Sequence, residues 1–203
     1  MDEARSQLLQ RILVEVSAHG LADRSLRDVA TAIGSSHRML NYHFGSRAGL
    51  VTAIVETVEA AQRDLLAELS AQIADPVDLS RALWERTVAV EMRPFVRLFF
   101  ECVALTGGKG LTDPWIALSR EISGRLGAPV DEDELRLGVA VTRGLLIDVL
   151  ATGDAAPATR AFERFLEMWA LRSGLVAGAT RPPGSATPAA RAPARRRPAR
   201  DRR

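Results

Sequence analysis

The short segment 36–43, SHRMLNYH, is rich in side chains that could recognise DNA. In the major groove, arginine can form two hydrogen bonds with guanine and asparagine two with adenine, and each such pair contributes about 1–3 kcal/mol of discrimination. We therefore predict that Arg38 and Asn41, together with His37, read base edges. The alternative that Arg38 only contacts phosphate, which would give affinity without sequence information, stays open.

Two short helices must present these side chains, and the sequence marks both of them. Ser25 followed by Asp28 has the form of a capping box, which opens a helix over about 25–33. A second helix is expected over about 36–43, with a serine at its start as the cap. Gly34 can adopt the positive φ that the turn between the two helices needs.

A preceding helix that ends at Gly20 completes a three-helix unit. Its apolar residues recur at spacings of three and four: Leu8, Leu9, Ile12, Leu13 and Val16. The two short helices supply a small core against it: Leu26, Val29, Ile33, Leu40 and Phe44. This arrangement is typical of a helix-turn-helix DNA-binding module. It leaves one set of side chains on or near the exposed face of the second short helix: Ser36, His37, Arg38, Met39, Asn41, Tyr42 and His43.

The stretch 25–50, SLRDVATAIGSSHRMLNYHFGSRAGL, resembles the signature of the tetracycline-repressor (TetR) family of transcriptional regulators. The likeness covers roughly residues 8–55. It rests on these positions: Val29, Ala30, Gly34, Leu40, Tyr42, His43, Phe44, Gly45, Ser46, Arg47 and Leu50. Two positions depart from the family pattern, since Arg38 stands where a small residue is common and Asn41 where an aromatic residue is common.

The resemblance implies roles for three of these positions and for Ser25. Ser25 would bond a phosphate at the start of its helix, where free backbone N–H groups assist. Tyr42 and His43 would brace the DNA backbone near the second short helix. Arg47, at a position where the family usually has lysine, would contact phosphate.

The remainder of the chain shows helical periodicity without a strand pattern, so we predict an all-α protein of about nine helices. The later helices are expected over about 47–73, 78–92, 95–106, 113–127, 132–153 and 158–177. We divide the chain into a helix-turn-helix domain (1–46), a helical ligand-binding and dimerisation domain (47–178) and a tail (179–203). The tail holds eight arginines and one aspartate, and its composition predicts disorder.

Bulky apolar side chains are concentrated in the central helices of the second domain. Many must form core, but helical bundles also place ligand cavities between helices, lined by apolar groups and a few polar ones. We predict contacts with a small, largely apolar effector from these residues: Trp84, Met92, Phe95, Phe99, Cys102, Trp115 and Arg143. Further polar candidates for the cavity are Arg93, Arg97, Glu101 and Thr106.

The last two helices are expected to form a homodimer interface. Their apolar stripes comprise Leu135, Val139, Thr142, Leu146 and Val149, then Phe162, Phe165, Leu166, Trp169 and Leu175. Gly138 and Gly144 would allow close approach, although burial within one subunit explains part of the pattern. Two recognition helices about 34–36 Å apart would enter successive major grooves, so the operator should be a near-palindrome of double-stranded DNA.

Several other classes of protein fit the sequence poorly. His37 and His43 are six residues apart, on different helix faces, so we expect no metal site and no cofactor. The run 107–110, GGKG, lacks the full phosphate-loop spacing, and Cys102 has no histidine after it in the chain, so we expect no catalytic residue. We find no apolar run long enough to span a membrane and expect a cytoplasmic protein.

One alternative stays open beside ligand-controlled repression. The net charge of 179–203 is +7, against +2 for the whole chain, so residues 1–178 carry −5. An arginine-rich tail could add phosphate contacts to a ligand-independent, architectural DNA-binding protein. The sequence also leaves open whether the regulator represses or activates.

Overall fold

The computed structural model describes residues 3–108, 110–128 and 130–173, which form nine α-helices and one short 3-10 turn without any strand. The helices are α1 (Glu3–His19), α2 (Leu26–Ala32), α3 (His37–Phe44), α4 (Arg47–Gln72), α5 (Pro76–Val88), α6 (Arg93–Thr106), α7 (Asp113–Arg125), α8 (Glu132–Thr152) and α9 (Ala155–Arg172), and the 3-10 turn η1 (Val90–Met92) precedes α6. The predicted all-α class is confirmed. The predictions for 179–203, and the predicted extension of the last helix to 177, lie outside the described residues.

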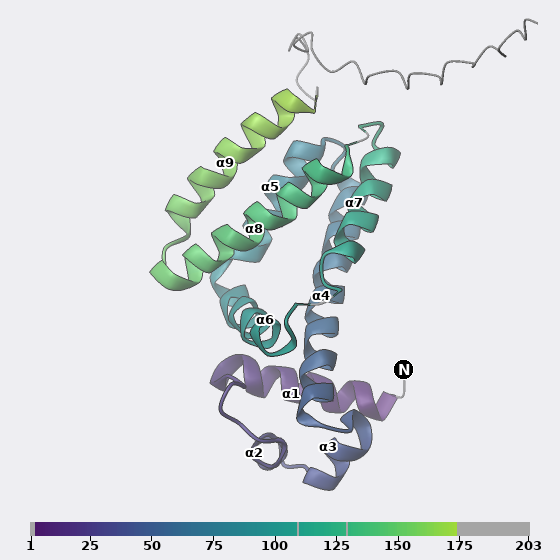
Figure 1. Cartoon of the computed structure of the whole chain (residues 1–203), viewed down its shortest axis with the longest axis vertical. Helices are drawn as coiled ribbons and strands as arrows, with labels where there is room; N and C mark the ends of the chain where they lie inside the picture. The colour runs from purple at the N-terminus through teal and green to yellow at the C-terminus, as the bar shows by residue number, and fades with distance from the viewer. Residues whose placement is uncertain (1–2, 109, 129, 174–203) are drawn as a thin grey trace, which may run out of the picture.

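Helices α1–α3 form a small unit at one end of the molecule (Figure 1). Its core consists of the apolar side chains predicted from the sequence, and Ile12, Val29 and Leu40 are completely shielded from solvent. The turn between α2 and α3 has Gly34 at φ 63°, a left-handed conformation that glycine adopts without steric cost. The unit is therefore a packed helix-turn-helix module.

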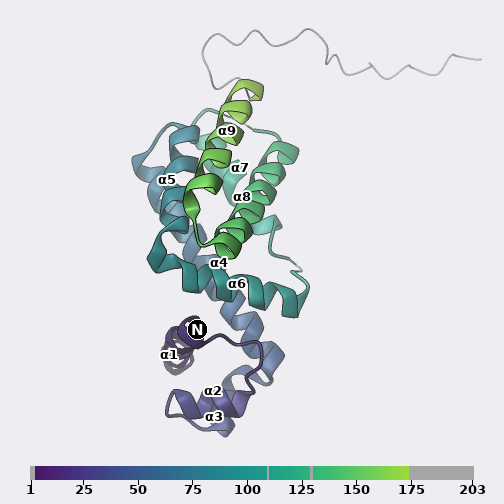
Figure 2. The same ribbon diagram turned by 90° about the vertical axis from the view of Figure 1, so that its left-hand side faces the viewer.

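Helix α4 connects this unit to the rest of the protein. It rises from α3 into the upper bundle, where α5, α6 and α7 pack against it (Figure 1). Helix α6 lies across the top of α1 and contacts both α1 and α4, as the two views together show (Figures 1 and 2). Helices α8 and α9 lie side by side at the outside of the bundle (Figure 2).

Three helices begin two or three residues earlier than the sequence pattern predicts. The predicted starts were 78, 95 and 158, whereas α5, α6 and α9 begin at Pro76, Arg93 and Ala155. In each case a proline lies in the first turn of the helix. The prediction treated these prolines as breaks, but the first N–H groups of a helix have no acceptor within it, so proline costs nothing there.

Candidate nucleic-acid interface and ligand cavity

Helix α3 presents its polar side chains to solvent. The Ser36 side chain accepts a hydrogen bond from the Met39 backbone N–H at 3.1 Å and so caps the helix. Leu40 and Phe44 are buried in the core that α3 shares with α1, α2 and α4, and this anchors one face of α3. The other face carries exposed His37, Arg38, Met39, Asn41 and Tyr42, with His43 half-buried. The predicted exposure is thus present, while contact with DNA stays a prediction.

Helix α2 begins with the predicted capping box. The Asp28 backbone N–H donates to Ser25 Oγ at 3.2 Å, and the Ser25 backbone N–H donates to Asp28 Oδ2 at 2.8 Å. The Ser25 hydroxyl also donates to this carboxylate, and these hydrogen bonds lower the pKa of Asp28. Ser25 is exposed at the start of α2, and a phosphate contact by its hydroxyl would have to replace the bond that it donates to Asp28, so this contact stays a prediction.

Two arginines of α1, which the sequence analysis did not single out, tie down the ends of the short helices. Arg5 donates to the His43 carbonyl at 3.3 Å, and its guanidinium lies 5.3 Å from the centre of the Phe44 ring. Arg11 donates to the Ile33 carbonyl. The last carbonyls of a helix lack partners within it, and a cation there is also favoured by the helix dipole. These contacts hold the C-terminal ends of α2 and α3 against α1.

Arg47, predicted to contact phosphate, has another set of partners in this structure. Its guanidinium donates to the carbonyls of Leu21, Ala22 and Arg24 at 2.9, 2.7 and 2.9 Å. The side chain therefore clamps the loop between α1 and α2 onto the start of α4. A phosphate contact by Arg47 would have to share or replace these bonds, and it stays a prediction.

The same loop is also held from α6. The Glu101 carboxylate accepts a hydrogen bond from the Leu21 backbone N–H at 3.1 Å, so Glu101 faces this loop and not the cavity for which it was a candidate. Cys102 points into the core shared with α1 and α4, and it does not line the cavity either. Burial raises the pKa of the Cys102 thiol to about 12, so the thiol stays protonated and unreactive.

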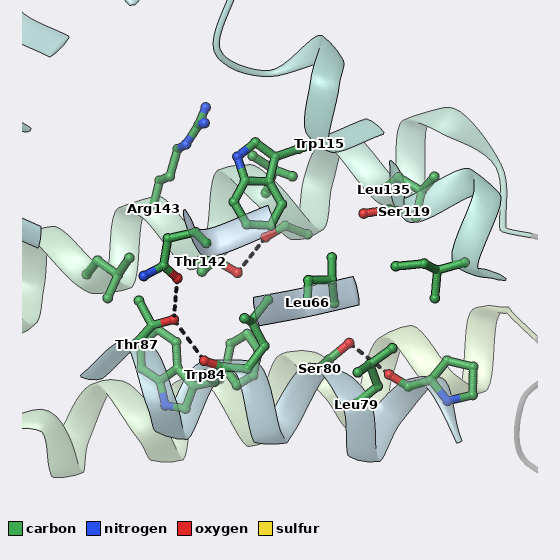
Figure 3. A pocket seen from close by; sticks show the side chains of 18 of the residues that line it. Leu66, Leu79, Ser80, Trp84, Thr87, Trp115, Ser119, Leu135, Thr142 and Arg143 are labelled. Carbon is green, nitrogen blue, oxygen red and sulfur yellow. Dashed lines mark hydrogen bonds between the residues drawn. The ribbon is translucent and has the colours of Figure 1, made fainter. Parts of the chain in front are cut away.

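A cavity of about 220 Å³ lies between α4, α5, α6, α7, α8 and α9. Of the seven residues predicted to contact an effector, all but Cys102 line it: Trp84, Met92, Phe95, Phe99, Trp115 and Arg143. Leucines 66, 79 and 135 and further apolar side chains complete a mainly hydrophobic wall (Figure 3). Cys102 lies seven residues after Phe95, on nearly the same face of α6, but further along the helix, where α6 packs on α1 and α4. Periodicity identified this apolar face but could not tell which part of its length borders the cavity.

The polar end of the cavity is built around Glu59, a buried carboxylate that the sequence analysis missed. It accepts hydrogen bonds from Arg143 at 3.2 Å, from Arg63 at 3.3 Å and from the Trp115 indole N–H. Arg143 also donates to Thr112 Oγ1 and to the Leu111 carbonyl. The cluster thus joins α4, α7 and α8 through one carboxylate. A signal was present in the sequence, since Glu59 lies four residues after Val55 and seven before Leu66, on the apolar stripe of α4.

The apolar residues proposed for a dimer interface are mostly inside the subunit. Leu135, Val139, Thr142 and Leu146 line the cavity, and Phe162, Phe165, Leu166 and Trp169 pack in a core with α5 and α8. A second apolar stripe faces solvent on each helix: Leu137 and Ile147 on α8, and Met168 and Leu171 on α9, all 45–58% exposed. Gly144 lies between the exposed residues of α8, and a Cβ there would meet nothing within 4 Å. A homodimer through α8 and α9 would therefore use this outer stripe.

None of the helices in the described part of the chain has the length and apolar content needed to cross a membrane. Within the same residues, no group of three or more histidine, cysteine, aspartate or glutamate side chains could hold a metal ion.

The chain is similar to known proteins in part of its sequence and in its fold. No family model matches the chain. Over 82 residues the chain is 28% identical to the HTH-type transcriptional repressor NicS of Pseudomonas putida, a match that covers 40% of this chain and 39% of that protein. The chain thus spans about two fifths of the length of the curated relative it matches.

Solved structures match nearly the whole described chain. A TetR-family transcriptional regulator from Pectobacterium atrosepticum has a TM-score of 0.70 at 22% identity, over 87% of this chain and 96% of its own. SmeT, the repressor of the multidrug efflux pump SmeDEF of Stenotrophomonas maltophilia, has a TM-score of 0.62 at 18% identity, over 91% and 96%. The multidrug binding protein EbrR in complex with ethidium has a TM-score of 0.59 at 23% identity, over 81% and 99%. The protein therefore has the fold of TetR-family transcriptional regulators, in agreement with the resemblance seen in its sequence.

Proposed function

We propose that the protein is a ligand-responsive transcriptional repressor, which binds a near-palindromic operator as a homodimer and is released by a small molecule. The observation that carries this proposal is that one chain combines an exposed polar helix face, suited to DNA, with an apolar cavity, suited to a small molecule. Exposed Arg38 and Asn41 lie on a helix that is fixed to α1, and an apolar cavity lies in the bundle above it. Such a regulator acts on DNA and would work in the cytoplasm.

Two helices connect the cavity to the DNA-binding unit. Helix α4 carries Glu59 at the cavity and Arg47 at the loop between α1 and α2. Helix α6 carries Phe99 at the cavity and Glu101 at the same loop. A ligand that shifts α4 or α6 would therefore move this loop and the helices attached to it. By linkage, the ligand weakens DNA binding to the extent that it prefers the shifted state.

Similar proteins bind small molecules. EbrR was crystallised with ethidium and SmeT with triclosan. The curated relative, NicS, is a transcriptional repressor, and the matched protein from Pectobacterium atrosepticum is a TetR-family transcriptional regulator. Together with the cavity in this chain, these facts favour ligand-controlled regulation over an architectural role, which would need no such cavity.

Selection of bound duplexes from a random DNA pool tests the proposal. We expect an enriched near-palindrome whose half-site centres are about one helical turn, or a multiple of it, apart, because two recognition helices must face one side of the duplex. The complex should contain an even number of protein chains. A protein that enriches no sequence at low salt, or that binds only single half-sites, would contradict the proposal.

The Arg38→Ala variant tests base reading by α3. We expect discrimination against a change at one operator base pair to fall by about 1–3 kcal/mol, because a bidentate arginine to guanine pair is lost. The measurement is the binding of wild-type and variant protein to a panel of single-base operator variants at fixed salt. Arg86→Ala, which removes an exposed arginine on α5, serves as the control. Weakening that is uniform across the panel would instead make Arg38 a phosphate contact.

A further inference from the structure

The cavity offers a ligand no charge that is free of a partner. Three charged side chains line it, namely Glu59, Glu134 and Arg143. Glu59 and Arg143 pair with each other at 3.2 Å, and Glu59 also binds Arg63. Glu134 pairs with Arg172 at 2.9 Å. A charged ligand would therefore lose its hydration and find each opposite charge already engaged.

The hydroxyl groups on the wall share one orientation. Thr87 and Thr142 donate their hydroxyl hydrogens to the carbonyls of Leu83 and Gly138, one turn earlier in the same helix, at 2.8 and 2.9 Å. The Gln62 side-chain oxygen lies 3.3 Å from the Thr87 hydroxyl and shares the same hydrogen. A hydroxyl has one hydrogen, so these oxygens meet the cavity as acceptors. Figure 3 shows Thr87 and Thr142 on the same side of the view as Arg143, away from Leu79 and Leu135.

Gln62 adds a hydrogen-bond donor that complements these acceptors. Its side chain lines the cavity, and while its oxygen accepts from Thr87, its NH₂ group can donate. Acceptors on α5 and α8 and a donor on α4 thus flank a predominantly apolar space. An uncharged group that donates one hydrogen bond and accepts one can pair with Gln62 and with one of the two threonines. A hydroxyl group is the simplest group of this kind.

We infer that the effector is an uncharged, mostly apolar molecule with a hydroxyl group, an alcohol or a phenol, which donates to Thr87 or Thr142 and accepts from Gln62. This inference rests on the proposed ligand control, since it assigns the ligand class of the same cavity. The cavity volume of about 220 Å³ lies below the range of roughly 300–1,000 Å³ that is common for drug-sized ligands, so the molecule is small.

The fluorescence of the protein's own tryptophans can report directly whether a ligand binds in the cavity. All three of its tryptophans, Trp84, Trp115 and Trp169, line the cavity, so tryptophan fluorescence reads its occupancy. The probes are 1-octanol, octanoate and octylammonium, which share one chain length and differ in charge. We expect saturable quenching by 1-octanol and at least tenfold weaker binding of both ions. Equal or tighter binding of either ion, or no quenching by 1-octanol up to its solubility, overturns the inference.

Threonine-to-valine variants test which side chains bind the hydroxyl group of the ligand. Thr87→Val and Thr142→Val keep the shape of the side chain and remove the acceptor, so together they should weaken 1-octanol binding about fivefold or more. The matched control is Thr57→Val, because Thr57 makes the same bond to its own helix, to the Ala53 carbonyl at 2.8 Å, outside the cavity. Unchanged affinity in the double variant overturns the assignment of the two threonines.

Operator binding, measured separately, distinguishes this inference from the proposed function. If 1-octanol fills the cavity but leaves DNA binding unchanged, the ligand class stands and ligand control by this class fails. If a charged molecule from the series releases the operator while 1-octanol does not, ligand control stands and the inferred class is wrong.

Discussion

The Glu59→Ala variant should lose about 3 kcal/mol of its free energy of unfolding, the lower end of the 3–5 kcal/mol typical of a broken buried ion pair. Glu59 is only 5% exposed and accepts bonds from two guanidinium groups and one indole N–H. Its removal leaves Arg143 with an unpaired charge against an apolar cavity. The lower end applies because the side chains of Arg143 and Arg63 keep about a quarter of their surface in solvent. Urea unfolding at one fixed protein concentration measures the loss.

Two companion variants separate the buried pair from other causes. Glu56→Ala removes an exposed carboxylate from the same helix and should change the free energy of unfolding by less than about 0.5 kcal/mol. Replacing both Glu59 and Arg143 by leucine should recover most of the loss, because apolar side chains of similar volume often substitute for a buried ion pair. A loss below about 1 kcal/mol in Glu59→Ala would show that the carboxylate contributes little to stability.

Ile147→Asp should convert the protein to a monomer and weaken operator binding by about a hundredfold or more. Ile147 is 53% exposed on α8 and belongs to the outer apolar stripe with Leu137, Met168 and Leu171. A carboxylate buried between two subunits would have no partner, and dissociation then separates the two recognition helices. Linking two binding units raises overall affinity by about 10²–10⁴, and this gain is lost in the monomer. Light scattering gives the oligomeric state, and titration with the selected operator gives the affinity.

Leu105→Asp is the matched control for this variant. Leu105 is 47% exposed on α6 and is not part of the outer stripe, so its replacement should leave the dimer and operator binding intact. Single half-site affinity should be the same in Ile147→Asp and in the original protein, because α1–α3 are unchanged. A dimeric Ile147→Asp protein with full operator affinity would exclude the outer stripe as the interface.

The sequence alone determined the features that depend on neighbours along the chain. Ser25 and Ser36 cap their helices as predicted, and Gly34 takes the left-handed turn. Helical periodicity also identified which face of α3 is buried, through Leu40 and Phe44. These features follow from hydrogen bonds and spacings within a few residues, so a local pattern is enough to predict them.

Only the tertiary structure determined which of several apolar helix faces are buried and which partners the long charged side chains contact. Helices α8 and α9 each carry two apolar stripes, and only packing against α5 determined that Phe162 and Trp169 lie inside while Met168 lies outside. Cys102 shares a face of α6 with Phe95, and only the packing of α6 on α1 and α4 put Cys102 in the core and not at the cavity. Periodicity gives the angle between two faces of a helix, but it does not say which face meets the core.

Polar contacts between residues far apart in the chain show most clearly what only the tertiary structure determines. Arg47 reaches carbonyls more than 20 residues earlier in the chain, Glu101 binds a backbone N–H 80 residues earlier, and Glu59 pairs with an arginine 84 residues later. Nothing local distinguishes these side chains from solvated charges, since a charge becomes structural only when the fold removes water from it and brings a partner within reach. The chain thus encoded its helices and their caps in its sequence, and folding alone joined the cavity to the DNA-binding unit.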